Sequence, residues 1–113
     1  MSVMRAVMLD QMARGLAAYL AKFPVEQLRE AAEKEQPLAA VTDKLLAQNP
    51  GVLSTMVKRE ITGLTDSDVQ PFLVSFLRYL PGDHKQAVTS NLEWASDQLK
   101  VVLGKLKAAA GMA

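Results

Sequence analysis

The sequence predicts an all-α protein, a compact bundle of five to six helices in a single domain that spans residues 1–113. Apolar residues recur every three or four positions through most of the chain, which is the spacing of an amphipathic helix. No segment shows the apolar–polar alternation that is typical of a strand. Evenly spaced prolines divide the middle of the chain into short segments, so the first and last helices are expected to be the longer ones.

The first segment, MSVMRAVMLDQMARGLAAYL, predicts a long amphipathic helix. One side of this helix carries a bulky apolar stripe at positions 4, 8, 12, 16, 19 and 23. The opposite side carries alanines and two valines, together with Asp10 and Arg14. A helix of this kind can pack on both sides, because small residues let another helix approach closely.

The methionines of the bulky stripe have two interpretations. Methionine is flexible and polarisable, so it fills gaps in a core, but Met-rich faces also act as adaptable binding surfaces. We favour the interpretation that these methionines lie in the core, and we keep a binding surface as the alternative. Under the second interpretation the candidate interaction residues are Met4, Met8, Met12, Leu16 and Tyr19.

We expect neither a signal peptide nor a membrane span in this chain. Asp10, Gln11 and Arg14 interrupt the apolar run that a signal peptide needs near its start. A membrane-spanning helix needs about 18 mostly apolar residues without charges, and no stretch of the sequence provides them.

Pro24, Pro37 and Pro50 predict the starts of three short helices, since proline is tolerated at the first position of a helix. Apolar residues follow each proline at helical spacing. Asn49 is a good N-cap for the third helix, and Gly63 is a suitable C-terminal stop. The three segments are FPVEQLREAAEKEQ, QPLAAVTDKLLAQ and NPGVLSTMVKREITG.

Residues 65–68 supply N-cap chemistry for a further helix, whose segment PFLVSFLRYL is apolar on nearly every side. Such a helix is normally central and buried. After a turn at residues 81–83, one long helix is expected to run to about Ala110. A heptad seam along it favours packing within the chain's own bundle, with an intermolecular coiled coil as the alternative. The seam consists of Val88, Leu92, Ala95, Leu99, Val102, Leu106 and Ala109.

Composition excludes several functional classes. The 13 basic and 12 acidic residues are interspersed, so no strong field indicates nucleic acid or an anionic membrane as partner. The chain has no cysteine, which excludes disulfides, thiolate metal sites and a cysteine nucleophile. This composition fits a reducing compartment, and we expect a cytoplasmic location.

Catalytic and metal-binding chemistry is not indicated by the remaining residues. His84, the only histidine, lies beside a turn and is expected to be solvated. Glu26, Glu30 and Glu33 line one helix face, but the Glu-x-x-His partners of carboxylate metal helices are missing. The sequence has neither a phosphate loop nor a Gly-x-Ser-x-Gly elbow. We therefore expect no catalytic residue, no metal, no cofactor and no enzymatic activity.

Residues 43–60 allow a different function, because DKLLAQNPGVLSTMVKRE can be laid on the helix-turn-helix pattern with Gly51 in the turn. Pro50 inside the turn and Glu60 at a position that needs an apolar residue count against this reading. Four residues of the second helix suit phosphate and base-edge contacts: Ser54, Thr55, Lys58 and Arg59.

The first functional hypothesis is a non-enzymatic protein-interaction module that forms a homodimer, or binds another protein, through apolar faces of its terminal helices. The alternative is a helix-turn-helix DNA-binding regulator that uses residues 43–60. The third is a carrier of a small apolar ligand, held between the Met-rich helix and the segment PFLVSFLRYL.

The missing metal chemistry generates a first prediction. The purified protein should be strongly helical in water without any cofactor, because helical periodicity alone accounts for its fold class. Circular dichroism should therefore be the same before and after treatment with a chelator. Loss of helical signal on chelation would contradict the prediction.

Overall fold

The computed structural model describes residues 3–34, 38, 42–44, 47 and 55–111, and within this part of the chain all regular structure is helical. The predicted all-α fold class is confirmed. The radius of gyration is 13.5 Å, close to the roughly 13 Å of a folded chain of this size. The helices are α1 (Val3–Leu20), α2 (Val25–Lys34), α4 (Thr55–Thr62), the 3-10 helix η2 (Asp66–Asp68), α5 (Val69–Arg78), α6 (Gly82–Thr89) and α7 (Leu92–Gly111).

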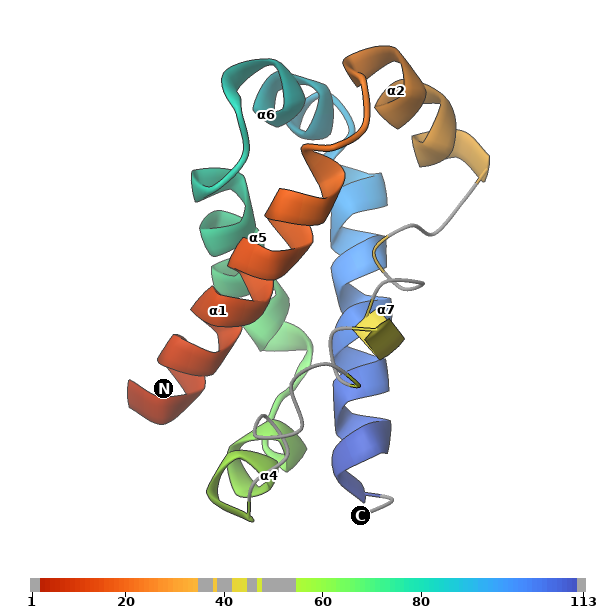
Figure 1. Ribbon diagram of the computed structural model, residues 1–113. Helices are drawn as coiled ribbons and strands as arrows, with labels where there is room; N and C mark the ends of the chain where they lie inside the picture. The colour runs from red at the N-terminus through yellow and green to blue at the C-terminus, as the bar shows by residue number, and fades with distance from the viewer. Residues whose placement is uncertain (1–2, 35–37, 39–41, 45–46, 48–54, 112–113) are drawn as a thin grey trace.

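Helix α5 packs against both α1 and α7, and these helices enclose the core. Helix α4 packs on α1 and α7 at the end of the molecule where the two termini lie, and α2 and α6 pack together at the opposite end (Figure 1). The longest helices are α1, with 18 residues, and α7, with 20. The expectation of longer helices at the two ends of the chain is thus confirmed.

Helix α2 begins directly after Pro24, as the sequence predicts. The carbonyl of Pro24 accepts a hydrogen bond from the Leu28 amide at 3.1 Å, which closes the first turn. The predicted helix starts at Pro37 and Pro50, and the N-cap at Asn49, lie outside the described residues.

Helix α1 ends at Leu20, one turn before the end of the predicted stripe. The chain continues as a turn in which the Phe23 amide donates to the Leu20 carbonyl at 3.1 Å. The rings of Tyr19 and Phe23 meet edge to face, with centroids 5.4 Å apart. The two aromatic residues of the stripe are therefore in contact although the helix does not extend to Phe23.

Helix α5 has a buried side and an exposed side. Phe72 and Phe76 are fully buried, and Leu73 is 5% exposed. Val74 is 49% exposed, so the prediction that this segment is buried nearly all round is wrong on one side. The physical reason is that neighbouring helices cover only the side of α5 that faces α1 and α7.

The predicted single helix from residue 83 to Ala110 is wrong, because the chain breaks it between α6 and α7. Three short polar side chains at the break compete for backbone groups. The hydroxyls of Thr89 and Ser90 donate to the carbonyls three residues earlier, at 3.0 and 2.7 Å. Asn91 Oδ1 accepts from the Trp94 amide at 3.4 Å and acts as an N-cap for α7.

The heptad seam packs within the chain's own bundle. Ala95, Leu99, Val102 and Leu106 are all fully buried on α7, and Val88 is buried on α6. Leu92, at the first position of α7, is 47% exposed. The seam from Ala95 to Leu106 is therefore covered in a single copy, as the favoured interpretation expects, and Ala109 is half-buried.

Buried polar side chains attach the segment around Leu38 to α7. Gln98 is 3% exposed, and its Oε1 accepts a hydrogen bond from the Leu38 amide at 3.3 Å. The hydroxyl of Thr42, which is fully buried, donates to the Leu38 carbonyl at 2.7 Å. Lys105 and Asp43 form an ion pair at 3.2 Å near the surface. These contacts hold the described part of this segment against the core.

Burial on α5 generates the second prediction. Phe76→Ala should lower the free energy of unfolding by about 3–5 kcal/mol, because it removes a fully buried ring and leaves a cavity. Leu73→Ala should cost about 2–5 kcal/mol for the same reason. Gln70→Ala on the same helix is the control, because Gln70 is exposed, and should change stability by less than about 0.5 kcal/mol. Urea denaturation measures all three, and losses below about 1 kcal/mol for both core variants would contradict the burial of this side.

Candidate interaction surface

The bulky stripe of α1 lies in the chain's own core. Met8 is 5% exposed, Met12 is 7% exposed and Leu16 is fully buried. Tyr19 is half-buried and packs against the core. Met4 belongs to α1, but its side chain lies outside what the structure describes. The described methionines of this stripe fill the core, which is the favoured interpretation, and a partner cannot reach them on the surface of a single folded copy.

The opposite side of α1 remains exposed. Val3 is 82% exposed and Val7, one turn further along, is 47% exposed. Ala6 and Ala18 are exposed as well. We call the positions 3, 7, 11, 14 and 18 the outer face of α1; all five residues are exposed. The sequence indicates that this side of the helix carries small residues, but it does not show that no other helix covers them.

A cluster of polar contacts borders the outer face and joins α1 to the end of α5. The Tyr79 hydroxyl donates to Asp10 Oδ2 at 2.6 Å. Arg78 Nη1 lies 3.7 Å from Asp10 Oδ1. Arg14 is placed over the Tyr79 ring, with its Cζ 5.6 Å from the ring centroid. Tyr79 thus contacts two residues of α1 that are one turn apart, which no spacing in the sequence indicated.

The hydrogen bond to Asp10 raises the pKa of Tyr79 above its ordinary value of 10.0, because the carboxylate accepts a proton that ionisation would remove. Burial and the negative charge of Asp10 raise the pKa further. The positive charges of Arg14 and Arg78 lower it, and the net effect is an increase.

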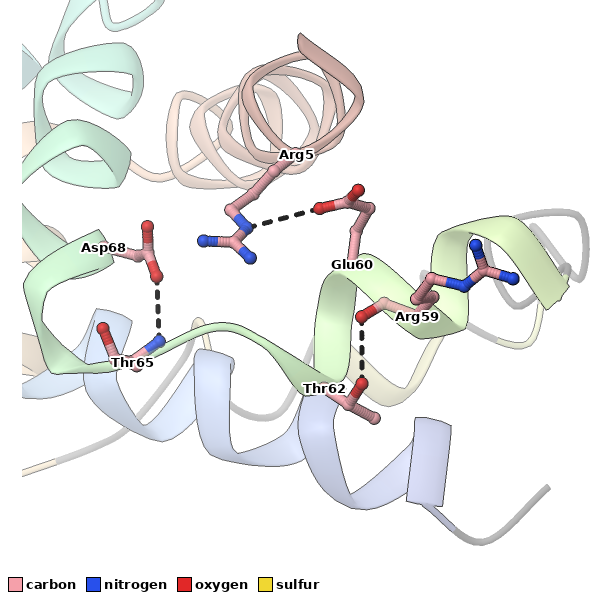
Figure 2. A network of polar contacts seen from close by, with 6 residues as sticks. All are labelled: Arg5, Arg59, Glu60, Thr62, Thr65 and Asp68. Atoms are coloured by element: carbon pink, nitrogen blue, oxygen red, sulfur yellow. Dashed lines mark hydrogen bonds and ion pairs between the residues drawn. The ribbon is translucent and has the colours of Figure 1, made fainter. Parts of the chain in front are cut away.

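A second group of polar contacts, on the other flank of α1, attaches this helix to α4 (Figure 2). Arg5 Nε lies 3.5 Å from Glu60 Oε2. Figure 2 shows Arg5 pointing from α1 into the space between Glu60 and Asp68. Asp68 is 5% exposed and accepts from the Thr65 amide at 2.8 Å in a capping box. Contacts on both flanks therefore determine how α1 is rotated about its axis.

Gly63 follows the last residue of α4, as predicted. Glycine is not required here by the left-handed backbone conformation that often ends a helix. None of the described glycines has a positive φ. A Cβ at Gly63 would lie 2.6 Å from Arg5 Nη2. Glycine here leaves room for the guanidinium that reaches α4 from α1.

The residues of the DNA-binding alternative are only partly described. Ser54 lies outside the described residues, and Thr55 and Lys58 belong to α4 but have no described side chains. Arg59 is exposed, and its carbonyl accepts from the Thr62 hydroxyl at 2.9 Å. Glu60 contacts Arg5 instead of occupying the apolar position that the motif requires. DNA contact through residues 43–60 stays a prediction.

His84 is half-buried rather than solvated, because its ring reaches the turn after α1. Its Nε2 lies 2.6 Å from the Phe23 carbonyl oxygen, so Nε2 carries the proton in this contact. Nδ1 is buried and has no hydrogen-bond partner. This residue therefore links α6 to the chain between α1 and α2.

A shallow pocket of about 390 Å³ lies between α2 and α6. The apolar-ligand hypothesis expected a site between α1 and α5, where the described side chains instead pack directly on one another. The pocket is mostly polar, which does not suit an apolar ligand. It is lined by Pro24, Val25, Glu26, Arg29, Asp83 and Gln86.

Within the described ranges, no group of three or more acidic or histidine side chains could hold a metal ion. Glu26 and Glu30 are exposed, and the side chain of Glu33 is not described. None of the described helices is long and apolar enough to cross a membrane.

Comparison of the chain with protein-family models, with curated proteins and with solved structures gives no match.

The Tyr79–Asp10 hydrogen bond generates the third prediction. Tyr79→Phe removes only the hydroxyl and should make the protein less stable than the unmodified chain below pH 10. Because the folded-state pKa is raised above the unfolded value, this advantage of the unmodified chain should be lost as pH rises through the folded-state pKa. Parallel urea denaturation from pH 8 to pH 11 measures the difference. An advantage that stays constant over this range would contradict the coupling.

Proposed function

We propose that this chain is a non-enzymatic cytoplasmic protein-interaction module and that its first partner is a second copy of itself. The observation that carries the proposal is the exposure of apolar side chains on the outer face of α1. Val3 and Val7 lie there on successive turns. Val74 is a further exposed apolar side chain, on α5.

The type of residue supports this proposal as well as its exposure. Single apolar residues on a surface are normal and need no explanation. Valine, however, is a poorer helix former than alanine, leucine, lysine or glutamate, because the preceding turn restricts its side chain. At an exposed position inside a helix, a polar helix former would therefore stabilise a single copy at least as well as valine does. Val7 and Val74 are both in this situation.

The proposal differs from the sequence-based hypothesis in the side of the helix that it uses. Met8, Met12 and the α7 seam are occupied by contacts within one copy. Self-association through the Met stripe would require the core to open. The outer face needs no such rearrangement, since its side chains already lie at the surface.

The fourth prediction tests self-association directly. Sedimentation equilibrium of the unmodified protein over a wide concentration range should show a monomer–dimer equilibrium. The double variant Val3→Ser and Val7→Ser should shift this equilibrium towards monomer, because it removes exposed apolar surface without touching the core. Leu92→Ser is the matched control: Leu92 is exposed to the same extent as Val7 but lies at the start of α7.

Sedimentation as a monomer at every concentration would overturn the proposed function. Equal weakening of the dimer by Leu92→Ser would place the contact elsewhere on the molecule.

A further inference from the structure

We infer that the second copy docks on the outer face of α1 with its own α1 antiparallel, about a two-fold axis that passes near Gln11. This inference rests on the proposed self-association and specifies its geometry. It follows from two independent features of α1: the order of large and small residues along the outer face, and the positions of Arg14 on this face and of Asp10 at its border.

The outer face is bulky in its first half and small in its second. Val3 and Val7 occupy the first half. Arg14 and Ala18 occupy the second, with the half-buried Gly15 at its edge. The Arg14 guanidinium lies over the Tyr79 ring of α5, with its Cζ 5.6 Å from the ring centroid, so Ala18 and Gly15 are left as the small residues of this half. Gln11 lies between the halves. Two identical surfaces of this shape fit together only when one is reversed, because each bulky half then meets a small half.

Reversal about Gln11 sets the register of the two helices. Position 3 then faces position 19 of the other copy, and position 7 faces position 15. Val7 meets Gly15 of the partner subunit, and Val3 lies beside Ala18 of the partner subunit. Small residues at these points let the helix axes approach to the short end of the usual 8–10 Å range. A two-fold axis is also the commonest symmetry among homo-oligomers.

The charges on α1 complement one another in the same register. In this register Arg14 of the partner subunit faces position 8. Asp10 lies two positions further along, an offset of about 3 Å along the helix axis. The flexible arginine side chain spans this offset, and the two-fold axis generates the pair twice. A parallel two-fold arrangement would instead bring like charges together at both positions, which is unfavourable.

Asp10 and Arg14 are available for this pairing in the folded chain. The side chain of Asp10 keeps 36% of its surface exposed although it contacts Tyr79 and Arg78. An ionised carboxylate has about four acceptor sites, so one further contact can be made. Arg14 is exposed, and its Cζ lies over the Tyr79 ring, 5.6 Å from the centroid. A guanidinium has five N–H donors, so this ring contact leaves donors for a carboxylate.

The contact area limits the strength of the dimer. One helix face against another buries less than the roughly 1,200–2,000 Å² of a stable interface. We therefore expect a weak, concentration-dependent dimer with a Kd on the order of micromolar or higher.

The absence of cysteine from the chain provides a sharp test of the register. A cysteine on the two-fold axis lies close to itself in the dimer, whereas a cysteine far from the axis does not. Gln11→Cys should therefore form a disulfide-linked dimer under mild oxidation at a concentration where the protein associates. Val3→Cys alone should not, but Val3→Cys mixed with Ala18→Cys should form the mixed dimer. All three positions are exposed, and circular dichroism checks that each variant folds.

Each outcome of this experiment is decisive. Cross-linking of Gln11→Cys and of the mixed pair, without cross-linking of Val3→Cys alone, supports the antiparallel dimer. Self-linking of both Gln11→Cys and Val3→Cys would overturn it in favour of a parallel pair. A dimer in sedimentation that is not cross-linked at Gln11→Cys would overturn this interface and leave the proposed self-association standing. A protein that remains monomeric in sedimentation would overturn both.

Discussion

The burial of one side of α1 is the interaction on which the remaining structure depends. Ala13, Leu16, Ala17 and Leu20 are fully buried, and α1 packs on both α5 and α4. A fully buried leucine contributes about 1.5–3 kcal/mol relative to an exposed one, so this side accounts for a large share of the stabilising burial. Without α1, the buried phenylalanines of α5 would lose one of the two helices that cover them. The position of α1 also decides which of its residues reach the surface.

Polar contacts on the two flanks of α1 determine its orientation more than they determine stability. Exposed ion pairs such as Arg78–Asp10 contribute at most about 1 kcal/mol. Their geometry is nevertheless specific, because Arg5 reaches α4 on one flank and Asp10 reaches Tyr79 on the other. Rotation of α1 about its axis would break both sets of contacts at once. The apolar stripe alone would tolerate a small rotation, since methionine adapts to irregular gaps.

Helical periodicity predicted the fold class, the buried stripes of α1 and α7 and the proline start of α2, because periodicity reports which side of a helix is apolar. It could not predict which sides would find a neighbour. Val74 and His84 show this: one lies exposed on a mostly apolar helix, and the other is half-buried against a carbonyl 61 residues away. The break at Ser90 was missed because its cause is local side-chain hydrogen bonding rather than a proline or a glycine. The candidate interaction residues that the structure describes lie in the core or at its edge. The sequence pattern placed the two valines on the opposite side of the helix, among its small residues, but did not indicate them as a contact surface.

The distribution of residue types on α1 connects its packing to its proposed role. Methionine has several rotatable bonds and loses up to about 2 kcal/mol of side-chain entropy when it is fixed, a cost that folding meets once in the core. Valine has essentially one rotamer in a helix, so docking costs its side chain almost no further entropy. The structure buries Met8 and Met12 and leaves Val3 and Val7 outside. The flexible methionines therefore lie where folding orders their side chains. The stiff valines lie at the surface, where a weak and reversible contact loses little side-chain entropy on docking.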